Sequence, residues 1–90
     1  MKILAKPVKV EEVEGSGLMS LLGEKVILLC ANYFYAGVLK GVNDEFVLLE
    51  DSSIVYETGP WGDKAWKDAQ MLGPEHFVMK SAIESFGRGK

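Results

Sequence analysis

The sequence predicts a mainly β domain in which a short N-terminal helix precedes a strongly bent, five-stranded antiparallel barrel. Residues 24–57 contain three β-rich runs separated by two short polar breaks, which is typical of a three-stranded meander. Gly37 and Gly41 interrupt the second run, and glycines at these positions suit a strand that bends sharply in a small barrel. Two further short β-like runs near the end of the chain bring the number of strands to five.

Length and composition indicate a single globular domain. Ninety residues leave no room for a second core. No apolar run approaches the length of a membrane span, and the first residues lack the apolar core of a signal peptide. The single cysteine, Cys30, lies inside an apolar run and fits a reducing compartment. We therefore expect a cytoplasmic protein that makes no contact with a membrane.

The charge balance argues mildly against a strong grip on phosphate. The net charge is −3, whereas surfaces that bind nucleic acid are usually basic. Acidic residues concentrate near the start of the chain and basic residues nearer its end, so one face of each sign is expected.

The N-terminal part predicts an extension followed by a helix. Residues 1–14 alternate loosely and fit an extended arm or an edge strand. Ser16 is suited to cap a helix. Three leucines then have the i, i+3, i+4 spacing of one apolar helix face: Leu18, Leu21 and Leu22. Gly23 follows where glycine commonly ends a helix, so we expect about two helical turns packed on the meander.

The three strands of the meander are expected at residues 26–31, 34–42 and 45–57. The breaks fall at Asn32 and at Asn43 with Asp44, residue types that tolerate left-handed backbone. The third strand is long enough to bend near Asp51.

The second half of the chain predicts a turn-rich loop and two short strands. Residues 59–64 are dense in turn-forming residues, and the pattern of residues 65–72 fits either a strand or a helical turn. Gly73 and Pro74 are expected to break the chain again. Short strands are then expected at residues 76–80 and 82–86, joined tightly through Ser81, before a tail.

Two stretches resemble the motifs of the Sm-like family of small barrels, which includes the Sm, LSm and Hfq proteins. Residues 37–44, GVLKGVND, look like the first motif, in which Gly-x-Leu precedes an apolar residue and an acidic turn. Residues 77–86, FVMKSAIESF, look like the second motif and are closest to its bacterial Hfq version. The resemblance implies one Sm-like domain over residues 1–90. Within it, residues 1–14 would be an N-terminal extension, 58–70 an inserted loop and 87–90 a tail.

The same resemblance implies a homo-oligomeric ring in which the fourth strand of one subunit pairs with the fifth strand of the next. Single-stranded RNA or DNA would then bind near the pore. The chain departs from the family at binding positions: Asn43 replaces the turn aspartate, and an apolar residue near Val47 replaces the base-contacting asparagine. Met79 and Lys80 replace an Arg-Gly pair. Of the Tyr-Lys-His triplet of Hfq only Lys80 remains, because Met79 and Ser81 stand at its other positions.

The first candidate nucleic-acid site follows from the ring, whose pore would bring two turns together. A lysine there can meet phosphate, and an amide can read a base edge. The residues are Asn43, Asp44, Lys80 and Ser81. The alternative interpretation is a pair of solvated turns.

Two aromatic groups are further candidates for stacking on bases. Tyr33 and Tyr35 are expected on one face of the second strand, where they either stack on bases or pack in the core or an interface. The inserted loop interleaves tryptophans with lysines: Trp61, Lys64, Trp66 and Lys67. This composition suits single-stranded nucleic acid, and it equally suits a loop that its tryptophans fix to the barrel.

Catalysis is not expected. His76 is the only histidine and Cys30 the only cysteine, so no metal cluster of these residues is predicted, and no cofactor motif is present. Three hypotheses follow: a non-catalytic ring that binds nucleic acid, an oligomeric module that binds protein through residues 61–67, and a monomeric SH3-like barrel that binds a peptide.

Overall fold

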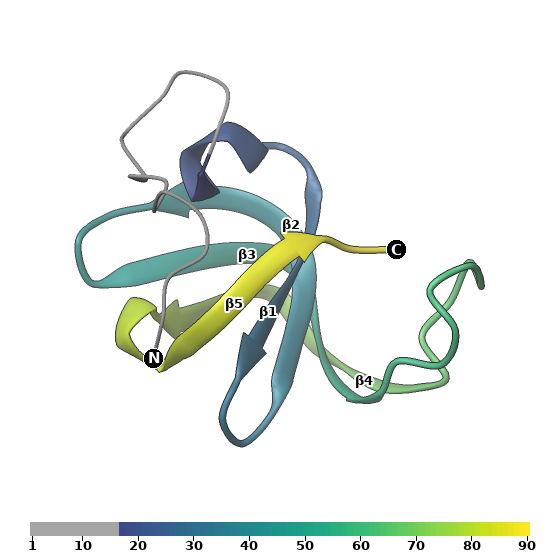
Figure 1. Cartoon of the computed structure of the whole chain (residues 1–90). Coiled ribbons are helices and arrows are strands. Elements are labelled where there is room, and N and C mark those ends of the chain that lie inside the picture. Colours follow the sequence, from purple (N-terminus) through teal and green to yellow (C-terminus); the bar gives the residue numbers. More distant parts are fainter. Residues whose placement is uncertain (1–16) are drawn as a thin grey trace, which may run out of the picture.

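The computed structural model describes residues 17–90 and is mainly β, as predicted (Figure 1). Its elements are η1 (Leu18–Leu21), β1 (Lys25–Cys30), β2 (Phe34–Val42), β3 (Phe46–Glu57), β4 (Asp68–Met79), η2 (Lys80–Ala82) and β5 (Ile83–Arg88). No helix among these residues is long and apolar enough to cross a membrane. The predicted extension over residues 1–14 and the cap at Ser16 lie outside the described residues.

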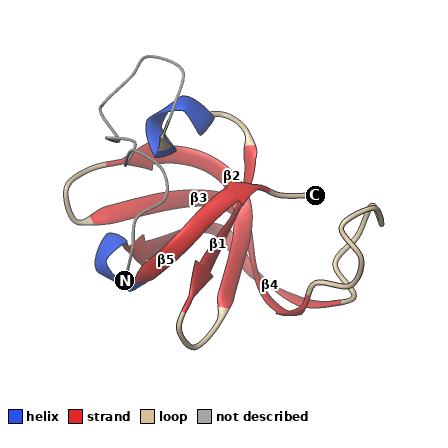
Figure 2. Ribbon diagram, viewed as in Figure 1, coloured by secondary structure: helices blue, strands red, loops and turns tan. Residues whose placement is uncertain are grey.

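The five strands form one antiparallel sheet in the order β4-β3-β2-β1-β5 (Figure 2). The sheet curls, because Val78 of β4 and Val26 of β1 belong to one buried cluster although two strands lie between them. It is not closed, however, so for the described residues the predicted five-stranded antiparallel sheet is confirmed, and the predicted barrel is a curled open sheet instead. The last two strands are joined tightly, as expected, but they do not pair with each other, since β4 pairs with β3 and β5 pairs with β1. The three residues of η2 carry the chain from one edge to the other instead of forming a hairpin.

The predicted bends of the second and third strands are confirmed. The pairing of β2 with β3 shifts register at Gly37 and again beside Gly41. A Cβ atom on Gly37 would lie 2.9 Å from the carbonyl oxygen of Glu50, so only glycine allows β2 to approach β3 this closely. Asp51 has a φ of 50°, and β3 shifts its register with β4 just beyond it.

Strand β4 is longer than the sequence predicts. It runs without a break through Gly73 and Pro74, where the sequence predicted an interruption. Proline fits here because β4 is an edge strand that pairs on one side only. The chain end also differs from the prediction, since Gly87 and Arg88 belong to β5 rather than to a tail.

The predicted two-turn helix is a single 3-10 turn. Gly17 and Gly23 flank it with left-handed backbone, at φ 80° and 83°. Immediately afterwards the amide of Gly23 donates to the carbonyl oxygen of Leu39 at 2.7 Å, which ties the chain to β2 and leaves no room for a second turn. Of the predicted leucine face only Leu21 is buried, while Leu22 is 43% exposed.

The core lies inside the curl of the sheet. It consists of seven buried strand residues capped by Leu21: Val26, Leu28, Cys30, Leu39, Val47, Leu49 and Val78. Residues on the outer face of the same strands are buried as well, notably Ile27 and Ala36, which face each other across β1 and β2. The outer face therefore also carries a covering layer, and the loop between β3 and β4 contributes to it.

Candidate functional site

The two turns predicted to meet at a pore already meet within one chain. The backbone amide of Lys80 donates a hydrogen bond of 2.8 Å to the carbonyl oxygen of Glu45. This bond joins η2 to the turn between β2 and β3, and so brings together Asn43, Asp44, Lys80 and Ser81, all of them exposed. We call these four residues the two-turn surface.

The side-chain oxygen of Asn43 is used within its own turn. Its Oδ1 accepts hydrogen bonds from the backbone amides of Glu45 at 2.8 Å and Phe46 at 2.7 Å. This is the arrangement by which asparagine stabilises a turn. Only the NH₂ group therefore remains to donate to a ligand.

The charge of the two-turn surface is mixed. The ammonium group of Lys80 makes no ion pair with any residue from 17 to 90 and is free to meet a phosphate. Asp44 and Glu45 stand beside it, however, so one chain offers one cation among carboxylates. Lys40, in the first motif, is not available, because its Nζ lies 2.8 Å from Glu75, and this hydrogen bond raises the pKa of Lys40.

The two tyrosines lie at the other end of β2 and differ in how far they are exposed. Tyr33 precedes the strand, is 47% exposed and meets Tyr56 edge to face, with ring centroids 6.1 Å apart. Tyr35 is half-buried against the core and stacks on His76 at 5.6 Å. Burial raises the pKa of Tyr35. Tyr35 is thus a packing residue, and only Tyr33 retains a face for a ligand.

The tryptophans of the inserted loop are fixed by the chain itself. Trp61 and Trp66 meet edge to face at 5.3 Å, and the Lys90 ammonium lies 4.8 Å from the centre of the Trp66 ring. Lys67 pairs with Glu57 at 3.3 Å, while Lys64 is exposed. Trp61 remains 59% exposed, and Trp66 is half-buried. The geometry matches a fixed loop more closely than an open stacking platform.

Lys90 holds the inserted loop in place, and the sequence did not indicate this role. Its Nζ donates to the carbonyl oxygens of Thr58 at 2.7 Å, Pro60 at 2.7 Å and Ala65 at 3.2 Å. Gly89 makes the approach possible, since a Cβ atom there would lie 2.9 Å from the Val26 carbonyl oxygen. In the sequence, only the glycines on either side of Arg88 point to this arrangement. They indicate that the backbone approaches another segment closely, but not which segment.

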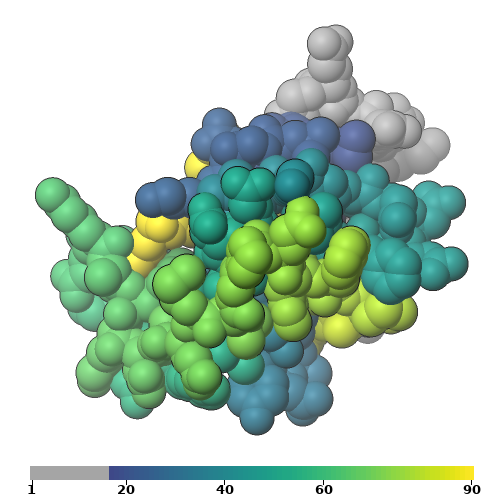
Figure 3. Space-filling view, turned by 180° about the vertical axis from the view of Figure 1, so that it is seen from behind, coloured from purple at the N-terminus to yellow at the C-terminus, as the bar shows by residue number. Residues whose placement is uncertain are grey.

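The two edge strands carry several exposed apolar side chains. On β4 these are Met71, which is 68% exposed, Leu72, Phe77, at 60%, and Met79. On β5 the exposed apolar residue is Phe86. Seen from behind, β4 runs across the face of the molecule from the loop towards η2 (Figure 3). Neither strand pairs on its outer side with any of residues 17–90.

The described residues offer no obvious metal site, because no three His, Cys, Asp or Glu side chains among them cluster to hold an ion. Cys30 is a buried thiol whose pKa is raised by burial and by the charge of Glu84. No family model matches the chain, and no curated protein matches it.

Proposed function

We propose that the protein is a non-catalytic, divergent Sm-like subunit that assembles into a homo-oligomer and binds single-stranded nucleic acid. The observation that carries the assembly is the pair of free sheet edges. Among residues 17–90, strand β4 at one edge and β5 at the other each present backbone groups that are unpaired on the outer side. An open edge of this kind is a template for another strand, and natural proteins usually cover or pair it.

A second copy of the chain suits both edges at once. When β4 of one copy pairs with β5 of the next, the backbone groups at both edges of every subunit form hydrogen bonds with its two neighbours. The contact also covers apolar surface on both strands, including Phe77 and Phe86, which water would otherwise surround. Such a head-to-tail contact closes into a ring when its rotation divides a circle, as in the Sm-like family.

The two-turn surface supports the choice of ligand. Within the two-turn surface one chain offers a single ammonium group, from Lys80, which pairs with no carboxylate among residues 17–90 and lies beside two carboxylates; this is too little for strong binding of phosphate. A ring repeats Lys80, Ser81 and the Asn43 amide once per subunit around one axis. Weak contacts repeated in this way add through avidity along one flexible strand.

A second candidate function rests on the inserted loop. Trp61 is 59% exposed, yet its loop is held by Lys90 through three carbonyl groups. A large apolar side chain presented on a fixed loop is typical of a protein-binding anchor. In this alternative the same oligomer is an assembly module, and Trp61 contacts a protein.

Binding of a fluorescent A-rich or U-rich oligonucleotide at low and moderate salt tests the proposed ligand. We expect retention that weakens with salt and with Lys80→Ala, while Lys40→Ala serves as a matched control, since it removes the same charge from a lysine that Glu75 already engages. Absence of binding at low salt to both RNA and DNA would overturn nucleic acid as the ligand. Loss of a protein partner on Trp61→Ala, with no oligonucleotide bound, would favour the assembly module.

A further inference from the structure

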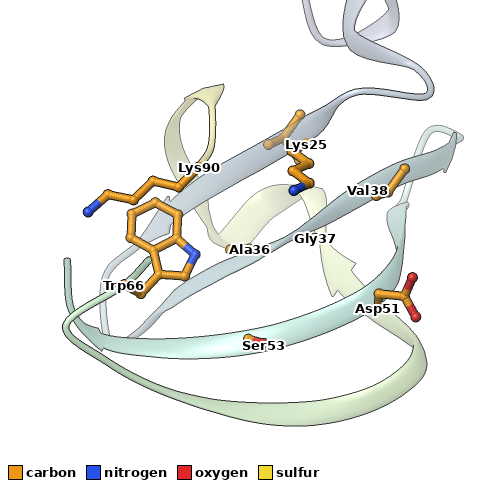
Figure 4. A pocket seen from close by; sticks show the side chains of 9 residues that line it. Lys25, Ala36, Gly37, Val38, Asp51, Ser53, Trp66 and Lys90 are labelled. Atoms are coloured by element: carbon orange, nitrogen blue, oxygen red, sulfur yellow. The ribbon is translucent and has the colours of Figure 1, made fainter. Parts of the chain in front are cut away.

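We propose that the outer face of the sheet holds a binding pocket for a small planar organic anion, separate from the two-turn surface. The cavity has a volume of about 340 Å³ and lies between β1, β2, β3 and the inserted loop (Figure 4). This volume is within the range of small-molecule sites. The pocket is built within one chain, so it does not depend on the proposed oligomer or its ligand.

The floor of the pocket is flat and apolar. Ala36 and Gly37 of β2 form it, and Val38 continues it along the strand. Ala36 presents only a methyl group on this face, and position 37 alternates to the opposite face of the strand, so a planar ring can lie close to the backbone here.

One wall is the Trp66 indole, which Lys90 holds in place. The aliphatic stem of Lys90 lines the pocket, while its ammonium group lies beyond the indole and bonds to the loop carbonyls. The N–H edge of the indole is turned towards Ala36 (Figure 4). No acceptor among residues 17–90 takes a hydrogen bond from this N–H group, so it is available to a ligand.

The charge inside the pocket is positive. The Lys25 side chain extends from β1 and turns its ammonium group inward over Gly37 (Figure 4). Its sequence neighbour Glu24 is engaged by Arg88 at 3.1 Å, and no carboxylate among the described residues pairs with Lys25. Ser53 adds a hydroxyl group from β3. Asp51, at the opposite end from Trp66, directs its carboxylate away from the pocket (Figure 4).

These groups together define the class of ligand. An aromatic ring fits between the indole and the flat floor, where stacking is favourable. A phosphate or carboxylate on that ring meets the Lys25 ammonium, with the Trp66 N–H and the Ser53 hydroxyl as further donors. The pocket thus favours a ring that bears one anionic group over a bare anion or an uncharged ring.

Fluorescence of Trp66 in a Trp61→Phe background tests this inference, since Trp66 is then the only tryptophan. The probes are phenyl phosphate, benzoate, inorganic phosphate and benzyl alcohol. We expect phenyl phosphate or benzoate to change the Trp66 fluorescence in a saturable manner. Its affinity should be at least about ten-fold higher than that of inorganic phosphate or of benzyl alcohol. The stronger of the two ring-bearing probes distinguishes a phosphate ligand from a carboxylate ligand.

Lys25→Gln should lower the affinity for the more tightly bound of these two probes by about ten-fold or more. Lys64→Gln should leave this affinity unchanged, because Lys64 is on the loop but outside the pocket. The indole N–H resonance of Trp66 in the unaltered protein gives a second readout that no variant can disturb, and it should shift on binding. The inference is overturned if neither ring-bearing anion shifts this resonance at millimolar concentration. Equal binding to the Lys25→Gln variant would also overturn it.

Discussion

The backbone amide of Lys80 lies 2.8 Å from the carbonyl oxygen of Glu45, so the turn that ends β4 is fastened to the turn that starts β3. This single bond brings together two motifs that lie more than thirty residues apart in the sequence. It also fixes where the chain leaves one sheet edge for the other. The two-turn surface is therefore a property of the single chain, and oligomerisation would only repeat it.

Asn43→Ala should destabilise the fold by about 1 kcal/mol, because the backbone amides of Glu45 and Phe46 lose their acceptor. Urea unfolding measures the change in the free energy of unfolding. Asp44→Ala is the matched control, since Asp44 is exposed in the same turn and no described residue bonds to its side chain. Equal stability of the two variants would contradict the role assigned to Asn43.

Gly37→Ala should cost about 2–3 kcal/mol or prevent folding, because the new methyl group would meet backbone atoms of Glu50 at 2.9 Å and Ser52 at 3.2 Å. Backbone cannot move aside as the end of a side chain can. Gly62→Ala is the control, since nothing lies within 4 Å of the corresponding Cβ position. Thermal unfolding of both variants provides the comparison, and a Gly37→Ala protein as stable as the control would refute the close approach of β2 to β3.

Lys90→Ala should release the inserted loop and shift the tryptophan emission to longer wavelength. The ammonium group that joins three carbonyl oxygens and faces two indole rings is then lost. Added n-propylammonium should restore the original emission in a saturable manner, because it supplies the missing group. Sodium chloride at the same ionic strength should have no such effect, and equal restoration by both salts would contradict the proposed contact.

The stability of the protein should fall more steeply at alkaline pH than that of a Cys30→Ala variant. Burial raises the pKa of the Cys30 thiol above its ordinary value of 9.0, so the unfolded chain loses this proton first as the pH rises. The protonated thiol contributes fully to the free energy of unfolding below pH 9.0. This contribution is lost as the pH rises through the higher pKa of the thiol in the folded state. Urea unfolding of both proteins on either side of pH 9.0 measures the difference in slope, and parallel curves would show that the thiol is not buried in solution.

Phe77→Lys should reduce the size of the oligomer, because it places a charge on the edge strand β4 where a second copy is proposed to pair. Met19→Lys is the control, since Met19 is a similarly exposed apolar residue on η1, away from both edges. Thermal unfolding verifies that each variant is folded. A change in size with Met19→Lys and none with Phe77→Lys would point to a different interface.

The sequence predicts the meander well because its signals are local. Strand β2 falls at residues 34–42 as expected, since β-rich residues run between the two polar breaks and the glycines mark the bends. Strand β4 was underestimated because Gly73 and Pro74 are turn signals everywhere except on an edge strand, and edge position is not visible in the sequence. The pairing of β5 with β1 was not predicted, because a three-residue 3-10 turn and a hairpin turn look alike in sequence.

The resemblance led us to expect the turns of Asn43 and Lys80 near one another at a pore. The structure adds a hydrogen bond between these two turns within one chain, from the Lys80 amide to the Glu45 carbonyl oxygen. The contact of Lys90 with Trp66 joins residues far apart in the chain through backbone carbonyl groups, which carry no signature in the side-chain sequence. The pocket beside them escaped prediction for the same reason, because strands and a distant loop assemble it.

Light scattering coupled to size-exclusion chromatography tests the central proposal most directly, since it gives the molar mass of the protein in solution. A head-to-tail oligomer predicts a mass several times that of the 9.9 kDa chain, independent of concentration over a wide range if the ring is closed. A mass of one chain at all concentrations would contradict the proposal that the β4 and β5 edges pair between copies.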